Sequence, residues 1–139
     1  MAEAASAAPF RWPVRVYWED TDAGGVVYHA SYLRFMERAR SEWMRRLGVD
    51  QSGLRQATGL AFMVRDMQLD FHKAALLDDE LSVTVEVKQQ RAASILFAQA
   101  ITNAAGDCLV TATVRVACVD LQRMRAAPIP ADLILQPAP

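Results

Sequence analysis

The sequence predicts an α+β domain in which one long helix packs on one face of an antiparallel sheet. Apolar residues recur at i, i+3, i+4 and i+7 between residues 32 and 47, which is typical of a helix with one buried face. Four strand-like segments follow, and their connections are too short for parallel pairing. The predicted order is therefore a strand, a long helix, a short helix and a meander of four strands.

The first strand is expected over residues 11–18, where Val14, Val16 and Trp18 share one face. The helix is expected to run for about 18 residues, at the ordinary spacing of an α-helix, and to end before Gly48. Its buried face carries Tyr32, Phe35, Met36, Ala39, Trp43 and Leu47. Its solvent face is expected to carry Arg34, Glu37, Arg38, Arg40, Glu42 and Arg45.

A short helical stretch over 50–58 precedes the change to β-structure. Residues 62–71 alternate in part, with Met67, Leu69 and Phe71 on one face, and residues 81–89 alternate cleanly. Residues 93–102 and 108–121 are joined by the turn 103–107, which is typical of a hairpin. An open sheet has free edges, so pairing with a second copy is expected.

Composition narrows the classes of protein. The 139 residues suit one domain, expected over residues 10–127 between a flexible tail (1–9) and a Pro-rich tail (128–139). The net charge of −1 gives no basic field for nucleic acid or an anionic membrane. Cys108 and Cys118, on one strand, would lie roughly 33 Å apart and could not bridge. With no apolar stretch of membrane-spanning length, a reducing, cytoplasmic setting is expected.

The segment between the first strand and the helix, VYWEDTDAGGVVYHASY (16–32), concentrates three carboxylates, two glycines and a histidine. A calcium loop fits poorly, because Gly24 and Ser31 stand where an EF-hand needs oxygen ligands. The pattern of a phosphate-binding P-loop is absent. An ordinary turn accounts for the acidic residues and glycines when each is taken alone.

The position of this segment favours chemistry. The N-terminus of the following helix offers unpaired N–H groups and a partial positive charge, which can polarise a carbonyl group. Asp22 lies a few residues earlier, where it could attack that carbonyl or activate water. Gly24 and Gly25 would let a substrate approach the backbone closely. We therefore predict a site for acyl transfer in which Glu19 and Asp20 have only turn and solvent roles.

Residues 16–43 closely resemble the hotdog-fold acyl-CoA thioesterases of the 4-hydroxybenzoyl-CoA thioesterase type, and most of all the branch associated with the bacterial Tol-Pal system. The likeness extends over about residues 11–130. It implies a hotdog fold, in which a five-stranded antiparallel sheet wraps a long central helix. It also implies hydrolysis of an acyl-CoA or acyl carrier protein thioester to free acid and thiol, without a metal or redox cofactor.

The resemblance also implies roles for individual residues. Asp22 matches the catalytic carboxylate, and His29 matches the position whose backbone N–H polarises the carbonyl, with its ring as a further candidate. Trp18 stands where this branch usually has tyrosine, so a positioning hydroxyl would be missing. Gly25 and Tyr28 are the other candidates for contact with substrate near this loop.

In relatives, CoA is held largely at subunit interfaces, and the matching segment here contains Lys88, Arg91 and Ser94. For Lys88 and Arg91 a solvated strand end is an equally good interpretation. The resemblance implies a homo-oligomer, a dimer or a tetramer, and leaves peripheral association with the inner membrane open. Two alternatives also stay open: a hotdog dehydratase or hydratase, and a non-catalytic acyl-thioester binder or interaction module of the envelope machinery.

Overall fold

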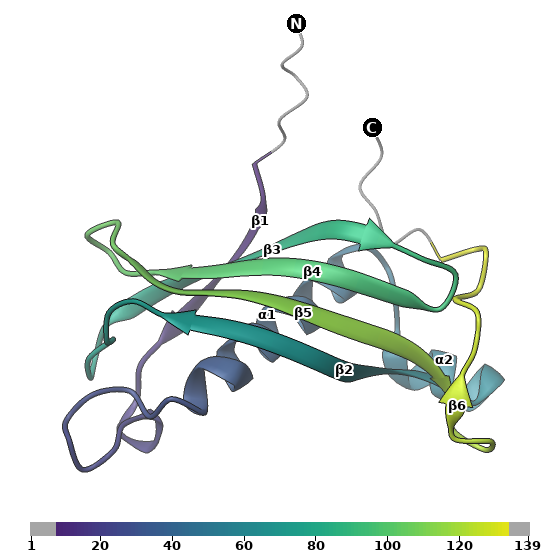
Figure 1. Cartoon of the computed structure of the whole chain (residues 1–139), viewed down its shortest axis with the longest axis horizontal. Helices are drawn as coiled ribbons and strands as arrows, with labels where there is room; N and C mark the ends of the chain where they lie inside the picture. Colours follow the sequence, from purple (N-terminus) through teal and green to yellow (C-terminus); the bar gives the residue numbers. More distant parts are fainter. Residues whose placement is uncertain (1–7, 134–139) are drawn as a thin grey trace, which may run out of the picture.

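An antiparallel sheet lies across the long helix α1 in the computed structural model, which describes residues 8–133 (Figure 1). The helices are α1 (Ser31–Arg46) and α2 (Gln51–Thr58), and a short 3-10 helix, η2, covers Trp18–Asp20. The strands are β1 (Phe10–Arg15), β2 (Leu60–Phe71), β3 (Glu80–Gln90), β4 (Ser94–Thr102), β5 (Cys108–Asp120) and β6 (Arg125–Ala126). The predicted order of elements is confirmed, with the two-residue strand β6 as an addition.

The sheet places β1 and β2 at its edges, in the order β1-β3-β4-β5-β2, and β6 pairs with the end of β5. Every neighbouring pair is antiparallel. Strand β2 shifts its register between Val64 and Asp66, which is the signature of a β-bulge. The free edge of β2 therefore combines a bulge with exposed apolar side chains, among them Met63 and Val64.

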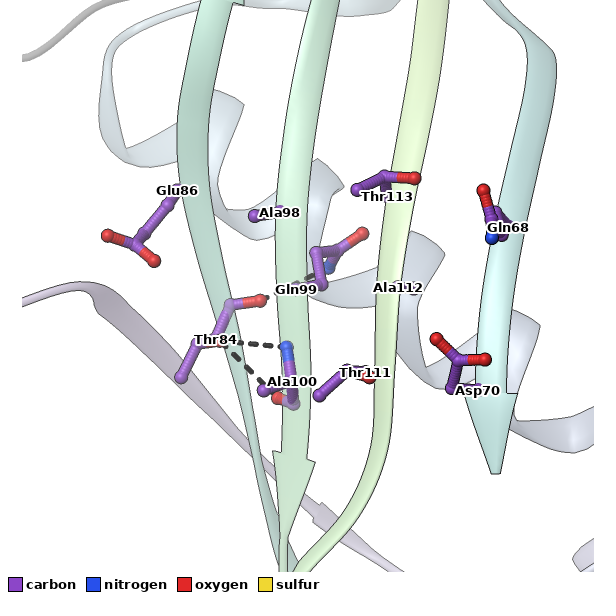
Figure 2. A pocket seen from close by; sticks show the side chains of 10 residues that line it. All are labelled: Gln68, Asp70, Thr84, Glu86, Ala98, Gln99, Ala100, Thr111, Ala112 and Thr113. Carbon is purple, nitrogen blue, oxygen red and sulfur yellow. Dashed lines mark hydrogen bonds between the residues drawn. The ribbon is translucent and has the colours of Figure 1, made fainter. Parts of the chain in front are cut away.

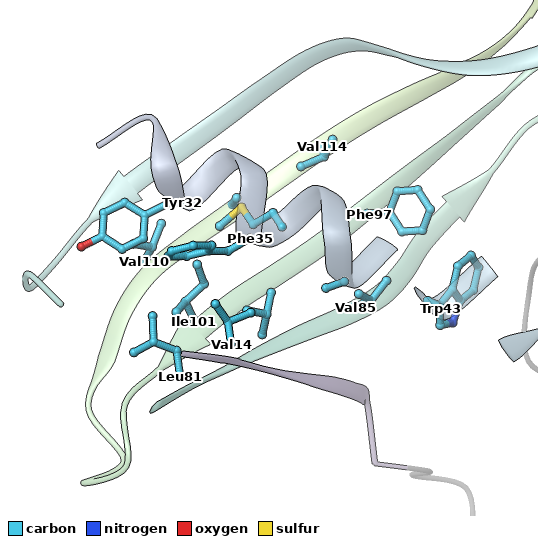
Figure 3. Close-up of a cluster of buried hydrophobic side chains, with 14 of the residues drawn as sticks. Val14, Tyr32, Phe35, Trp43, Leu81, Val85, Phe97, Ile101, Val110 and Val114 are labelled. Atoms are coloured by element: carbon cyan, nitrogen blue, oxygen red, sulfur yellow. The ribbon is translucent and has the colours of Figure 1, made fainter. Parts of the chain in front are cut away.

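The core lies between α1 and the inner face of the sheet (Figure 3). Phe35 and Met36 of α1 are completely buried, and Trp43 meets Phe97 of β4 edge to face with ring centroids 5.4 Å apart. Alternate residues of β3, β4 and β5 complete this core: Leu81, Val83, Val85, Ile95, Phe97, Ile101, Val110, Val114 and Val116. The helical periodicity of the sequence thus defines the face of α1 that is buried, and the strand alternation defines the face of the sheet that covers it.

Several expectations about side-chain exposure are wrong. Trp18 is 79% exposed rather than aligned with Val14 and Val16, because the strand ends at Arg15 and the chain turns into η2. Leu47 is exposed rather than buried, because it lies just after the last residue of α1.

Arg40 departs from its predicted position in the opposite sense: it is expected from the sequence on the solvent face of the helix, but it is buried. It follows Met36 by one helical turn, on the face that the sheet covers. Its guanidinium donates to Gln99 Oε1 at 2.9 Å. The polar face of α1 is therefore narrower than the sequence suggests.

The buried Arg40 is part of a small polar network inside the core. Gln99 Nε2 donates to the backbone carbonyl oxygens of Met36 (3.2 Å) and Thr84 (3.3 Å), so the amide joins α1 to β3 and β4. Burial lowers the pKa of Arg40 from its ordinary value, and the nearby carboxylate of Glu37 opposes that shift. A charged residue on a helix can thus be buried where a neighbouring strand supplies a matching amide.

The chain after β5 stays attached to the sheet as far as the structure describes it. Ala127 N–H donates to Cys118 O (2.9 Å) and Ile129 N–H donates to Ala92 O (2.7 Å). The two cysteines are free, one exposed and one buried. The expected tails lie partly outside the described residues, and the domain limits at 10 and 127 stay predictions. None of the helices in residues 8–133 is long and apolar enough to span a membrane.

Tyr32 provides a test of how α1 is anchored to the segment before β3. Its buried hydroxyl oxygen accepts the Ala75 N–H at 3.0 Å, and burial raises the pKa of this phenol. Tyr32→Phe leaves that N–H unsatisfied, so we expect the free energy of unfolding to fall by about 1–3 kcal/mol. Urea denaturation followed by circular dichroism measures the change. Tyr28→Phe, on an exposed ring, should change stability by less than about 0.5 kcal/mol.

Candidate active site

The acidic, glycine-rich segment forms a tight loop between η2 and α1. Asp22 N–H donates to Val26 O at 2.9 Å, and Gly25 N–H donates back to Asp22 O at 3.0 Å. Thr21 and Val27 pair antiparallel across its base. Gly25 has φ +83°, a left-handed conformation that favours glycine, so this residue is needed first for the turn itself.

The loop is docked on the segment that connects β2 to β3. Val27 N–H donates to Ala75 O at 2.9 Å, and Val26 pairs with Leu76. Since Ala75 also binds the hydroxyl of Tyr32, the loop and the first turn of α1 share one support. The loop is therefore positioned by the body of the fold as well as by its own turn.

The carboxylate of Asp22 is exposed and only partly engaged. Its Oδ1 accepts the Gly24 N–H at 2.8 Å, an Asx-type contact that orients the side chain. Its Oδ2 accepts no hydrogen bond from residues 8–133. A Cβ added at Gly24 would lie 3.1 Å from Asp22 Oδ1, which is a tight contact. Gly24 thus leaves room for the carboxylate, and one carboxylate oxygen stays available to a substrate or to water.

The N-terminus of α1 carries the complementary polarity. Ala30, the N-cap residue, has no capping side chain, and the N–H groups of His29 and Ala30 donate to no other described residue. Both therefore remain available at the positive end of the helix dipole. The ring of His29 is exposed and lies against Tyr28, with centroids 4.5 Å apart and planes tilted by 51°.

Asp20 differs from what the sequence suggested, because it is buried rather than solvated. Only 3% of the residue is exposed, and its Oδ2 accepts the Tyr17 N–H at 2.9 Å. Its backbone oxygen accepts the Tyr28 N–H at 2.9 Å. Sequence reasoning missed Asp20 and its partners Ser31 and Arg34, because a DxD pair in a turn gives no sign of which carboxylate faces inward.

Trp18 and Tyr28 both stay exposed next to this loop. Trp18 lines a hollow of about 360 Å³ together with Tyr17, Glu19, Leu77 and Asp78. Tyr28 contacts the ring of His29 instead. The structure therefore brings five of the predicted residues to one end of α1: Trp18, Asp22, Gly25, Tyr28 and His29.

Lys88, Arg91 and Ser94 lie elsewhere, at the hairpin between β3 and β4 (Figure 1). Arg91 N–H donates to Ser94 O at 2.8 Å, and the side chains of Lys88 and Arg91 are exposed. In the figure this hairpin and the Asp22 loop occupy opposite ends of the molecule. A single protomer therefore does not join these three residues to Asp22.

A larger hollow of about 430 Å³ lies over the middle of the sheet, lined mainly by polar and small side chains (Figure 2). Thr84, Ala100 and Thr113 are among its lining residues, whereas Asp22 and His29 are not. Within residues 8–133, no three His, Cys, Asp or Glu side chains gather as they would around a metal ion. The predicted catalytic residues thus lie outside this hollow, at the N-terminus of α1.

These groups match the needs of a reaction at a carbonyl group. A carboxylate with one available oxygen can supply a nucleophile or a general base. Unpaired N–H groups at a helix N-terminus can stabilise the negative charge that develops on the carbonyl oxygen. The arrangement offers both functions on one short segment.

Comparison with known proteins agrees with this class of site. The profile of the thioesterase-like superfamily matches residues 16–136. A solved structure of a probable thioesterase from Bartonella henselae, 34% identical, superposes with a TM-score of 0.83 over 88% of this chain and 100% of that chain. The chain belongs to the thioesterase-like superfamily and has its hotdog fold.

Within that superfamily the chain is of the YbgC type. It is 46% identical over 127 residues to the acyl-CoA thioester hydrolase YbgC of Escherichia coli O6:H1, covering 91% of this chain and 94% of the relative. It is 49% identical over 124 residues to the acyl-CoA thioesterase YbgC of Haemophilus influenzae, covering 89% and 90% respectively.

Gly24→Ala tests whether the turn positions the Asp22 carboxylate. The added methyl group would press on Asp22 Oδ1 and lengthen its bond from the residue 24 N–H. We expect kcat for thioester hydrolysis to fall roughly tenfold, because small displacements of a reacting group are costly. Gly48→Ala, at the far end of α1, is the matched control: its left-handed φ costs stability but should leave kcat unchanged. Equal kcat for Gly24→Ala and wild type would contradict this role.

Proposed function

We propose that this chain hydrolyses acyl-CoA thioesters to a free acid and CoA, with Asp22 as the catalytic carboxylate and His29 N–H as the main oxyanion donor. The observation that carries the proposal is the exposed Asp22 carboxylate on a loop that leads directly into the uncapped N-terminus of α1. The names of the YbgC relatives, at 46% and 49% identity over nearly the whole chain, support the same reaction.

The chemistry follows two possible courses. Asp22 can attack the thioester carbonyl carbon, which releases the CoA thiolate and leaves a mixed anhydride for water to hydrolyse. Alternatively Asp22 takes a proton from water, and the resulting hydroxide attacks the same carbon. In both courses the carbonyl oxygen becomes negative, and the His29 N–H stabilises it within the partial positive field of α1.

The substrate-binding residues divide into two groups. Trp18, Gly25 and Tyr28 lie at the Asp22 end, where they would contact the acyl and pantetheine parts of the substrate. Lys88, Arg91 and Ser94 lie at the opposite end, so they would contact CoA bound to Asp22 of a second copy. The complete site therefore requires a homo-oligomer.

The edge strand β2 is the surface that best suits pairing of two copies. Only β5 among the described strands pairs with it, so one side of its backbone is free. Met63, Val64 and Phe71 of β2 expose 44%, 46% and 53% of their surfaces. Antiparallel pairing of β2 with the same strand of a second copy would satisfy the free backbone groups and reduce the exposure of these side chains. It would also bring the Asp22 end of one protomer towards the β3–β4 hairpin of the other.

Several finer expectations remain predictions. They are a tetramer built from such dimers, an acyl carrier protein as an alternative thioester donor, a cytoplasmic location, peripheral association with the inner membrane, and a place beside the Tol-Pal system.

Asp22→Asn tests the catalytic carboxylate. The amide keeps the acceptor for Gly24 N–H but is neither a nucleophile nor a base. We expect kcat to fall by at least about 10²-fold in a thiol-release assay over a panel of short, long and aromatic acyl-CoAs. Asp107→Asn, which alters an exposed ion pair with Lys73, is the matched control and should keep full activity. Activity of Asp22→Asn at the wild-type level would refute the assignment of Asp22 as the catalytic carboxylate.

Val64→Lys tests the β2 interface. A charge in the middle of a buried strand pair should dissociate the oligomer, measured by sedimentation velocity, and reduce kcat/KM at least about tenfold because the site is shared. Ala105→Lys, in the exposed turn after β4, should change neither the sedimentation coefficient nor kcat/KM. A monomeric wild-type protein with full activity would refute the shared site.

A further inference from the structure

Asp20 is the only buried carboxylate among residues 8–133, and it is incompletely satisfied. Its Oδ1 is shielded from solvent and accepts no hydrogen bond from any described residue. Burying a charged group with few partners costs stability, so this placement requires a reason other than stability. The proposed reaction makes no direct use of Asp20.

The backbone of Asp20 closes the loop that carries Asp22. Its carbonyl oxygen accepts the Tyr28 N–H at 2.9 Å and the Ser31 hydroxyl at 3.1 Å. Asp22 follows Asp20 by two residues, and His29 follows Tyr28 by one. Asp22 therefore lies inside the loop that the contact between Asp20 and Tyr28 closes, and His29 lies directly after it.

Arg34 connects this closure to the first turn of α1. Its Nη2 donates to Ser31 Oγ at 2.8 Å and lies 3.5 Å from Asp20 Oδ1. The Arg34 side chain is 47% exposed whereas that of Asp20 is 4% exposed, so solvent screens this ion pair only from one side. The negative charge of Asp20 thus holds the guanidinium in the position where it also binds Ser31.

We propose that Asp20, Ser31 and Arg34 form a loop clasp that positions the Asp22 carboxylate relative to the His29 N–H. This inference rests on the proposed function, in which those two groups act together. Asp20 and Arg34 are positioning residues, since neither would touch the substrate. A displacement of about 1 Å between reacting groups can reduce a rate by about 10²-fold, so such a clasp has a large effect on kcat.

If the clasp positions the loop, the charge of Asp20 should matter more for kcat than the shape of its side chain. In the Asp20→Asn variant, the side-chain carbonyl oxygen would still accept the Tyr17 N–H. The new amide NH₂ group, however, would face the donors of Arg34, which would then turn to solvent and leave Ser31 with a single partner. We therefore expect this variant to keep the Tyr17 contact while the closure of the loop is loosened.

Asp20→Asn, Arg34→Gln and the double variant are compared by steady-state hydrolysis of an acyl-CoA that the wild type accepts. We expect kcat to fall roughly 10- to 100-fold in each single variant, with KM changed less than about twofold. The double variant should be no slower than the slower single variant, because both substitutions remove the same ion pair. Arg34→Lys should restore part of kcat, since it keeps the charge at this position.

Arg45→Gln is the matched control, because Arg45 pairs with Glu42 on the same helix but far from the loop. It should keep wild-type kcat and KM. Thermal unfolding of every variant shows whether it is folded. If Asp20→Asn does not fold, the test rests on Arg34→Gln alone, because the Arg34 side chain is half-exposed and its replacement should be tolerated.

The outcomes separate this proposal from the proposed function. Wild-type kcat in folded Asp20→Asn or Arg34→Gln, together with an inactive Asp22→Asn, overturns the clasp and leaves the function intact. Wild-type activity in Asp22→Asn overturns the catalytic role of Asp22, and with it the reason for a clasp that positions this carboxylate, whereas a wild-type protein that hydrolyses no acyl-CoA overturns the function itself. Additive losses in the double variant, or a change confined to KM, also overturn the clasp.

Discussion

The packing of α1 against the sheet is the constraint on which the rest of this structure depends. The helix presents aromatic and sulfur-containing side chains to three neighbouring strands, and Phe35, Met36 and Phe97 are completely buried between them. Burial of such side chains is the largest favourable contribution to a fold of this size. Because the contact holds the whole length of α1, it also determines where the N-terminus of the helix points.

The loop that carries Asp22 is held by that packed base as well as by its own turn. Its turn is short and exposed, and its hydrogen bonds run to Ala75, to the first turn of α1 and to the backbone of Asp20. Functional groups on loops are effective when a scaffold positions them, and the scaffold for the proposed site is the helix end and the segment before β3. The buried carboxylate beside the exposed one is the least expected part of this arrangement.

The core also contains a small polar network that includes a buried charged residue. Arg40 donates to Gln99, and Gln99 in turn donates to backbone oxygens of α1 and β3. The same principle operates at Asp20, where neighbouring donors partly compensate a buried charge. In both places a residue that looks solvated in the sequence is covered by another part of the chain.

The sequence determined the α+β class, the position of α1, the alternation in β3, and the Asp22–His29 segment at a helix N-terminus. These features are local, since periodicity, turn residues and a helix start depend on neighbours within a few positions. The tertiary structure alone decided that Arg40 and Asp20 are buried, that Trp18 is exposed, and that Lys88, Arg91 and Ser94 lie far from Asp22 within one protomer. Burial depends on which element covers a position, and the spacing between sites depends on strand order, so neither can be deduced from the local sequence.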